Sequence, residues 1–183
     1  MTAPEMETQP SFADAVAALF DARFRTLFRY LNRLTGDPDL AADLAQEAFV
    51  RLYQRGAIPD DPNAWLATVA TNLFRDVRRR ARRRAELAAA HARSDGAIAV
   101  DAVPRPDAAL ATHETRSRVR AALTALPRRD RELLLLRHEG YSYRDLARIV
   151  GVAEGSVGTM LIRATRAFRA AVERATPRLD AIG

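Results

Sequence analysis

The chain of 183 residues has no cysteine, no lysine and only three histidines. The lack of cysteine excludes disulfides, thiol catalysis and cysteine-ligated zinc. The histidines are scattered, and His113-Glu114 lacks the second histidine of a zinc-protease helix. Gly155 to Gly158 is not a nucleophile elbow, and the sequence has no glycine-rich phosphate loop. We therefore predict a protein that is not an enzyme, with no catalytic residue, no metal site and no cofactor.

Long apolar runs are also missing. No stretch is long enough to cross a membrane, and the acidic N-terminal segment MTAPEMETQP is not a signal peptide. These absences predict a soluble cytoplasmic protein with no membrane insertion. We expect residues 1–10 to form a disordered tail, since the first residues of a domain are often poorly ordered.

The basic side chains are all arginine, and they outnumber the acidic ones. The sequence has 29 basic and 23 acidic residues, a net charge of +6 and a calculated pI of about 10.8. Arginine can form paired hydrogen bonds to phosphates and base edges, so nucleic acid is the leading partner class. The alternative is a solvated surface encoded by a GC-rich genome, which would also favour arginine over lysine.

The spacing of apolar residues predicts an all-α protein. Apolar positions recur every three or four residues, which predicts helices over 11–34, 40–54, 64–84 and 107–125, then a helix between Pro127 and Gly140, and a final pair of helices after it. Proline, glycine and serine between 85 and 106 indicate a linker, and the preceding helix can continue into its start. The sequence thus predicts two small helical domains, at 11–84 and 107–176, joined by a flexible linker at 85–106 and followed by a tail at 177–183.

The second predicted helix, at 40–54, carries a polar row opposite its apolar stripe. Asp43, Gln46, Glu47 and Val50 are spaced so that they share one exposed face. This face could bind a basic partner or could simply be solvated.

The third predicted helix, at 64–84, ends in the run RRRARRR. Trp65 belongs to its apolar stripe, so we expect it in the core. Asn72, Arg75 and Arg79 fall on or near the outer side. Positive charge suits a helix C-terminus, but this density is costly unless an anion neutralises it. A nucleic-acid backbone is the natural candidate.

Residues 141–168 have the pattern of a helix-turn-helix. Ser142 and Asp145 can form a capping box, Gly151 can adopt the left-handed turn, and Val157 can pack between the two helices. The second helix, from Glu154 to about Ala171, carries polar and basic residues on one side: Ser156, Thr159, Arg163, Arg166 and Arg169. A plain helical hairpin is the alternative.

Three stretches together resemble the extracytoplasmic-function (ECF) sigma factors of bacterial RNA polymerase. They are DLAQEAFVRLY from Asp43, AWLATVATNLFRDVRRR from Ala64, and ALTALPRRDRELLLLRHEGYSYRDLARIVGVAEGSVGTMLIRATRAFR from Ala122. Two separate motifs in the right order are more specific than a helix-turn-helix alone. The resemblance implies a factor that binds core RNA polymerase and directs promoter-specific transcription initiation.

The resemblance also implies partners and site residues. The clamp helices of the polymerase's largest subunit would bind Asp43, Gln46 and Glu47, and an anti-sigma factor is an expected partner. Promoter DNA would be held at two elements. The minus-ten residues are Asn72, Arg75, Arg78 and Arg79, and the minus-thirty-five residues are Arg144, Glu154, Ser156, Gly158, Thr159, Arg163 and Arg166.

The sequence departs from the family pattern in the second helix of the motif. Many members have lysine where this chain has Gly158, and arginine where it has Met160. Either Gly158 allows close approach to DNA, or the promoter contact is weaker. The loop at 55–63 also looks short. The competing hypotheses are a stand-alone helix-turn-helix regulator of transcription and a helical adaptor that binds only protein.

Overall fold

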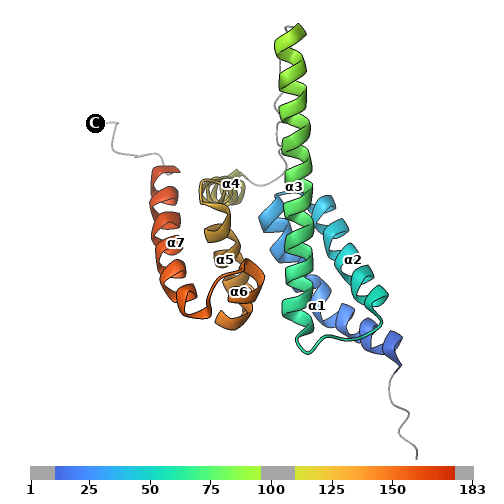
Figure 1. Ribbon diagram of the computed structural model, residues 1–183. Helices are drawn as coiled ribbons and strands as arrows, with labels where there is room; N and C mark the ends of the chain where they lie inside the picture. The colour runs from blue at the N-terminus through green and yellow to red at the C-terminus, as the bar shows by residue number, and fades with distance from the viewer. Residues whose placement is uncertain (1–10, 96–109, 176–183) are drawn as a thin grey trace, which may run out of the picture.

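The computed structural model describes residues 11–95 and 110–175, and all of their regular structure is helical (Figure 1). We call residues 11–95 the front half and residues 110–175 the rear half. The helices of the front half are α1 (Phe12–Thr35), α2 (Pro38–Arg55) and α3 (Pro62–Asp95). Those of the rear half are α4 (Leu110–Thr124), α5 (Arg128–His138), α6 (Tyr143–Val150) and α7 (Glu154–Ala175). The all-α prediction is confirmed.

Helix α1 begins at the residue that the sequence indicated. The Ser11 hydroxyl accepts a hydrogen bond from the Asp14 backbone N–H at 3.2 Å, and the Asp14 carboxylate accepts one from the Ser11 N–H at 3.0 Å. This capping box satisfies two donors that have no partner within the helix. At the other end Gly36 has φ 76°, a left-handed conformation that suits glycine.

Helix α2 starts earlier than predicted, at Pro38 rather than Leu40. The predicted break at 36–38 is present, but its proline occupies the first turn of α2, where the missing N–H costs nothing. The Asp37 carboxylate accepts hydrogen bonds from the N–H groups of Asp39 and Leu40 at 3.0 and 3.1 Å. The cap therefore fixes the helix start just after Gly36.

Helix α3 is longer than the predicted 64–84 and extends into the segment assigned to the linker. It runs from Pro62 to Asp95 and projects beyond the rest of the chain in Figure 1. Alanine and arginine have high helix propensity, and Arg82 pairs with Glu86 one turn later at 2.7 Å. The rest of the predicted linker, 96–106, and the predicted tails at 1–10 and 177–183 lie outside the described residues.

The last two helices form the predicted helix-turn-helix. The Ser142 hydroxyl accepts from the Asp145 N–H at 3.2 Å, and the Asp145 carboxylate accepts from the Ser142 N–H at 3.1 Å. Gly151 has φ 73°, and Val157 is fully buried where α7 packs on α6. The helix from Arg128 also begins after Pro127, as predicted.

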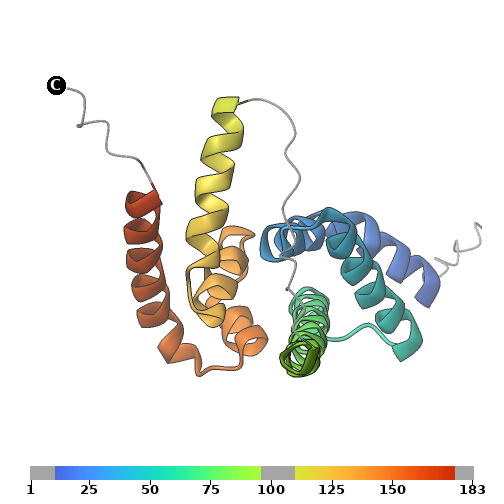
Figure 2. The same cartoon turned by 90° about the horizontal axis from the view of Figure 1, so that it is seen from above.

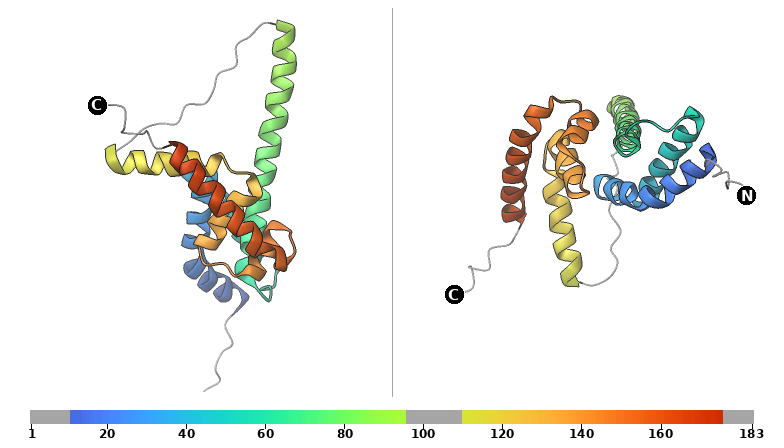
Figure 3. Two further views of the ribbon diagram at one scale, coloured as in Figure 1. Left: turned by 90° about the vertical axis from the view of Figure 1, so that its left-hand side faces the viewer. Right: turned by 90° about the horizontal axis from the view of Figure 1, so that it is seen from below.

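The two halves lie side by side, as Figures 2 and 3 show from several directions. One buried apolar cluster includes Leu27 and Leu66 of the front half and Leu136 and Leu146 of the rear half. Trp65 packs against this cluster but is partly exposed, so its predicted core position holds only in part. The chain therefore has two regions that share buried surface.

Candidate nucleic-acid interface

The polar row of α2 is accessible. Asp43, Gln46 and Val50 are exposed, while Glu47 is partly exposed and pairs with Arg51 at 2.9 Å. The opposite side of the helix is buried through Leu44, Ala45, Ala48, Phe49 and Leu52. The predicted division of this helix into a buried stripe and an open face is confirmed, and the open face also exposes Tyr53.

The four residues predicted for the minus-ten element follow one another along α3. Asn72, Arg78 and Arg79 are exposed, whereas the Arg75 side chain is only 22% exposed. The Asn72 Oδ1 accepts a hydrogen bond from Arg75 Nη1 at 3.0 Å. Asn72 and Arg75 therefore act on each other directly.

Arg75 is also bound by the rear half. Its Nη2 donates to Glu132 Oε2 at 2.6 Å, and its Nε donates to Oε1 at 3.3 Å. Glu132 lies on α5 and its side chain is fully buried. Paired hydrogen bonds between a guanidinium and a carboxylate are among the strongest polar contacts in proteins. Arg75 is thus less accessible than its helical position predicts.

The residues predicted for the minus-thirty-five element mostly share one side of α7. Ser156, Thr159, Arg163 and Arg166 are exposed on the side away from the buried residues Val157, Leu161 and Ala164, and Glu154 is exposed at the first position of the helix. Arg163 Nη2 donates to Asp130 Oδ1 of α5 at 2.8 Å, yet its side chain remains 65% exposed. This contact stays within the rear half, so it supports the surface of α7 without covering it.

Two further predicted residues lie at the edges of this surface. Gly158 is partly buried, and a Cβ added there would meet Tyr143 Cε2 at 3.6 Å, an ordinary contact. Packing within the described residues therefore does not require glycine at this position. Arg144 is exposed on α6 and lines a groove with Arg148 and Trp65, on the side where α6 faces the front half.

Acidic residues that the sequence analysis did not single out hold the two halves together. The Glu139 side chain, 3% exposed, is paired with both Arg29 and Arg33 of α1. Asp61, just before α3, accepts a hydrogen bond from Arg148 of α6 at 3.0 Å through Oδ2. Its other oxygen, Oδ1, accepts from the Ala64 N–H at 3.0 Å. The arginines lie far from Glu139 and Asp61 in the sequence, so no local sequence pattern predicts these ion pairs.

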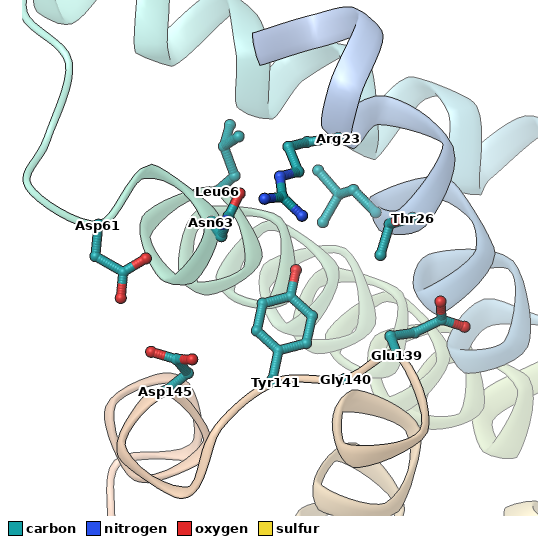
Figure 4. A pocket seen from close by; sticks show the side chains of 10 residues that line it. Arg23, Thr26, Asp61, Asn63, Leu66, Glu139, Gly140, Tyr141 and Asp145 are labelled. Atoms are coloured by element: carbon teal, nitrogen blue, oxygen red, sulfur yellow. The ribbon is translucent and has the colours of Figure 1, made fainter.

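A tyrosine fills the space between the halves. Tyr141 precedes α6, and Figure 4 shows its ring directed toward Arg23 of α1, with Asp61 and Asp145 to one side. Burial raises the pKa of Tyr141 from 10.0 to about 12. The hydroxyl of the ring therefore favours its neutral form.

Neither a metal centre nor a membrane span was found in 11–95 and 110–175. In these ranges no three residues of the types His, Cys, Asp and Glu are grouped so as to hold a metal ion. No helix there combines the length and the hydropathy that a bilayer crossing needs. The exposed charged faces of α2, α3 and α7 are the candidate binding surfaces of the described residues.

A helix-turn-helix joined to a second helical unit with an arginine-rich helix defines a class of DNA-binding transcription protein. Comparison with known families makes this more specific. The family described as Sigma-70 region 2 matches residues 19–84, and the family described as Sigma-70, region 4 matches residues 116–168. The two matches fall on the front and rear halves.

Relatives and a solved structure agree with these matches. The ECF RNA polymerase sigma factor SigL of Mycobacterium tuberculosis is 33% identical over 162 residues, which cover 86% of this chain and 88% of that protein. EcfG of Rhodopseudomonas palustris, also an ECF sigma factor, is 37% identical over 139 residues, covering 72% and 70%. The sigma factor RpoE of Bartonella quintana, solved with the anti-sigma factor NepR, has the same fold, with a TM-score of 0.65, 22% identity and coverage of 87% and 97%.

The chain therefore belongs to the ECF family of RNA polymerase sigma factors. Members of this family bind core RNA polymerase and direct initiation at promoters. The prediction drawn from the sequence is confirmed at this level, and the alternative of a stand-alone helix-turn-helix regulator is disfavoured.

Proposed function

We infer that the two halves divide the work of initiation. Within the front half, the domain predicted over 11–84 binds the clamp helices of the polymerase's largest subunit through Asp43, Gln46 and Glu47. It then holds the opened minus-ten strand with Asn72, Arg75, Arg78 and Arg79. The observation that carries this proposal is the separation of the two surfaces, one on the open face of α2 and the other along α3. An unstacked base and a displaced strand need a pocket and arginines of this kind.

The rear half is the proposed reader of the minus-thirty-five element. Glu154, Ser156, Thr159, Arg163 and Arg166 would enter the major groove, with Gly158 in the same surface and Arg144 near phosphate. The exposed polar side of α7, backed by buried Val157 and Leu161, supports this placement. An anti-sigma factor is the proposed regulator, because RpoE was solved with one. The site of action is the cytoplasm, where the polymerase works.

Polymerase binding is tested by changing Asp43→Ala together with Gln46→Ala. Both side chains are exposed, so the fold should be retained while co-purification with core polymerase falls about tenfold or more. The matched control is Asp21→Ala with Asp60→Ala, which removes two carboxylates from exposed positions of the front half that lie outside α2. Equal co-purification of the two double variants would contradict the proposed contact.

Strand capture is tested by Asn72→Ala in run-off transcription and permanganate footprinting with core polymerase. Asn72 is exposed and touches Arg75, so the change should reduce promoter opening and leave assembly with polymerase intact. We expect opening to fall about tenfold, the effect of one lost base contact. Thymine reactivity equal to that of the unchanged protein would refute the assignment.

A further inference from the structure

The junction between the halves contains a cleft whose walls are mostly arginine. Arg75, Arg78, Arg79 and Arg82 line it from α3, and Arg128 and Arg131 line it from the first turn of α5. The minus-ten assignment covers three of the α3 residues, but it gives no role to Arg82, Arg128 or Arg131. The cleft exists only while the two halves are packed together, since α3 of one and α5 of the other each supply one wall.

The carboxylates nearby compensate only part of this charge. Glu132 bonds Arg75 at 2.6 Å and lies 3.8 Å from Arg128, Asp76 pairs with Arg79 at 3.0 Å, and Glu86 pairs with Arg82. Within the described part of the chain, no carboxylate lies within 4.0 Å of the Arg78 or the Arg131 guanidinium. Six arginines thus face three carboxylates, so the cleft keeps an excess of positive charge.

Arg131 is the least satisfied of the six. Its Nε is buried and has no hydrogen-bond partner in the structure. Burial lowers the pKa of Arg131, and the nearby charge of Arg78 lowers it further. A buried donor without an acceptor is costly, and two guanidinium groups that face each other add repulsion. An anion in the cleft offsets the repulsion between Arg78 and Arg131, since it can accept hydrogen bonds from their guanidinium groups on the open side.

The start of α5 adds to the attraction for an anion. Pro127 precedes the helix and provides no side-chain cap. Basic side chains in a first turn oppose the helix dipole, which places positive charge at the same end. The acidic residue of this turn, Asp130, is buried and engaged by Arg163, so it does not offset the arginines of the cleft.

The arrangement of the arginines on α3 indicates an elongated anion. Residues 75, 78, 79 and 82 follow one face of the helix, and the rise from the first to the last is about 10 Å. A single ion would meet only part of this row, whereas linked phosphates can meet successive guanidinium groups with paired hydrogen bonds. We propose that the cleft between α3 and α5 is a binding site for a chain of phosphates, formed jointly by the two halves.

This site goes beyond the proposed promoter contacts, and it has a consequence for them. A ligand that binds only the packed arrangement stabilises it in proportion to its concentration. A free oligophosphate in the cleft would therefore keep Arg75 against Glu132 and compete with the promoter strand for Arg78 and Arg79. The phosphates could belong to a free oligophosphate or to a single-stranded nucleic acid, since the guanidinium groups recognise the same chemistry in both.

The test uses the full chain without polymerase, so its result is independent of the polymerase and promoter assignments. Inorganic tripolyphosphate is titrated by calorimetry at constant ionic strength, with sodium sulfate as the reference anion. We expect tripolyphosphate to bind more tightly than sulfate, and Arg131→Gln to weaken it about tenfold, the value of one charge-assisted hydrogen bond. The matched control, Arg129→Gln, changes an exposed arginine of the same turn that does not line the cleft.

A second variant tests the cleft without changing a partly buried residue. Arg82 is exposed at the rim, with 82% of its side chain accessible, so Arg82→Gln should fold normally and still weaken tripolyphosphate binding severalfold. Tripolyphosphate should also reduce the radius of gyration measured by small-angle X-ray scattering. Sulfate-like affinity, or equal affinity of Arg131→Gln and Arg129→Gln, would overturn the site.

A second titration identifies the source of the phosphates. A single-stranded oligodeoxynucleotide of mixed sequence is titrated into the same three variants. If Arg131→Gln and Arg82→Gln weaken it and Arg129→Gln does not, the cleft binds nucleic-acid backbone. If only tripolyphosphate shows this pattern, the ligand is a free oligophosphate. Either pattern supports the cleft, and the absence of both overturns it.

Discussion

The front and rear halves each carry arginines predicted to bind DNA, but they hold them differently. Arg163 of α7 is paired with Asp130 of its own half and stays 65% exposed. Arg75 of α3 is paired with Glu132 of the other half and is only 22% exposed. The surface proposed to read the duplex is therefore complete within one half. The accessibility of the surface proposed to bind the opened strand depends on how the two halves are arranged.

Replacing Glu132 and Asp130 of α5 in turn should distinguish the ion pair between the halves from the ion pair within the rear half. Glu132→Ala leaves the half-buried Arg75 without its carboxylate, so we expect the free energy of unfolding to fall by about 3 kcal/mol. Asp130→Ala should cost less, because Arg163 can turn to solvent. Urea denaturation measures both changes. Equal losses in the free energy of unfolding would show that the ion pair between the halves contributes no more to stability than the one within the rear half.

A change confined to the rear half gives the next largest effect. Gly158→Ala replaces glycine inside α7, where the new Cβ meets only Tyr143 at 3.6 Å. Alanine is favoured over glycine in helix interiors by about 1 kcal/mol, so thermal denaturation should show a higher midpoint. The radius of gyration should not change, since α7 is stabilised without touching the front half. A lower midpoint would mean that glycine is needed for packing.

The smallest effect at neutral pH is expected at the junction itself. Tyr141→Phe keeps the ring and should leave stability near pH 7 unchanged. Because burial raises the pKa of Tyr141 from 10.0 to about 12, the unfolded chain ionises first as the pH rises. The stability due to the neutral ring is thus fully present below pH 10 and is lost toward pH 12. Denaturation between about pH 9 and 12 should show this loss in the unchanged chain and a weaker one in Tyr141→Phe. Identical profiles would contradict it.

Local chemistry explains why so much of the fold was predictable. The caps at Ser11 and Ser142, the left-handed Gly151 and the buried Val157 each follow from residues a few positions apart. The open face of α2 follows in the same way from helical spacing. The helix predicted over 64–84 continues to Asp95, because alanine and arginine favour helix and no glycine or proline interrupts the sequence before Gly96.

The contacts between the halves could not be predicted in this way. Arg75 and Glu132 are 57 positions apart, and Arg148 and Asp61 are 87 apart. Glu132 stands beside four leucines in the sequence, which weakly indicates a buried carboxylate. Spacing alone does not show which arginine pairs with it. The accessibility of Arg75 thus depended on tertiary packing, while that of Asn72 and Arg163 followed from their own helices.

The Asp61 carboxylate couples the first turn of α3 to α6, because each of its oxygens bonds one of them. One oxygen secures the first turn of α3 through the Ala64 N–H, and the other holds Arg148 of α6. Linkage is reciprocal, so whatever frays that turn also loosens α6, and whatever pulls α6 away makes the turn easier to fray. A partner that binds the loop before α3 would in this way change how firmly the helix-turn-helix is held, without contacting it.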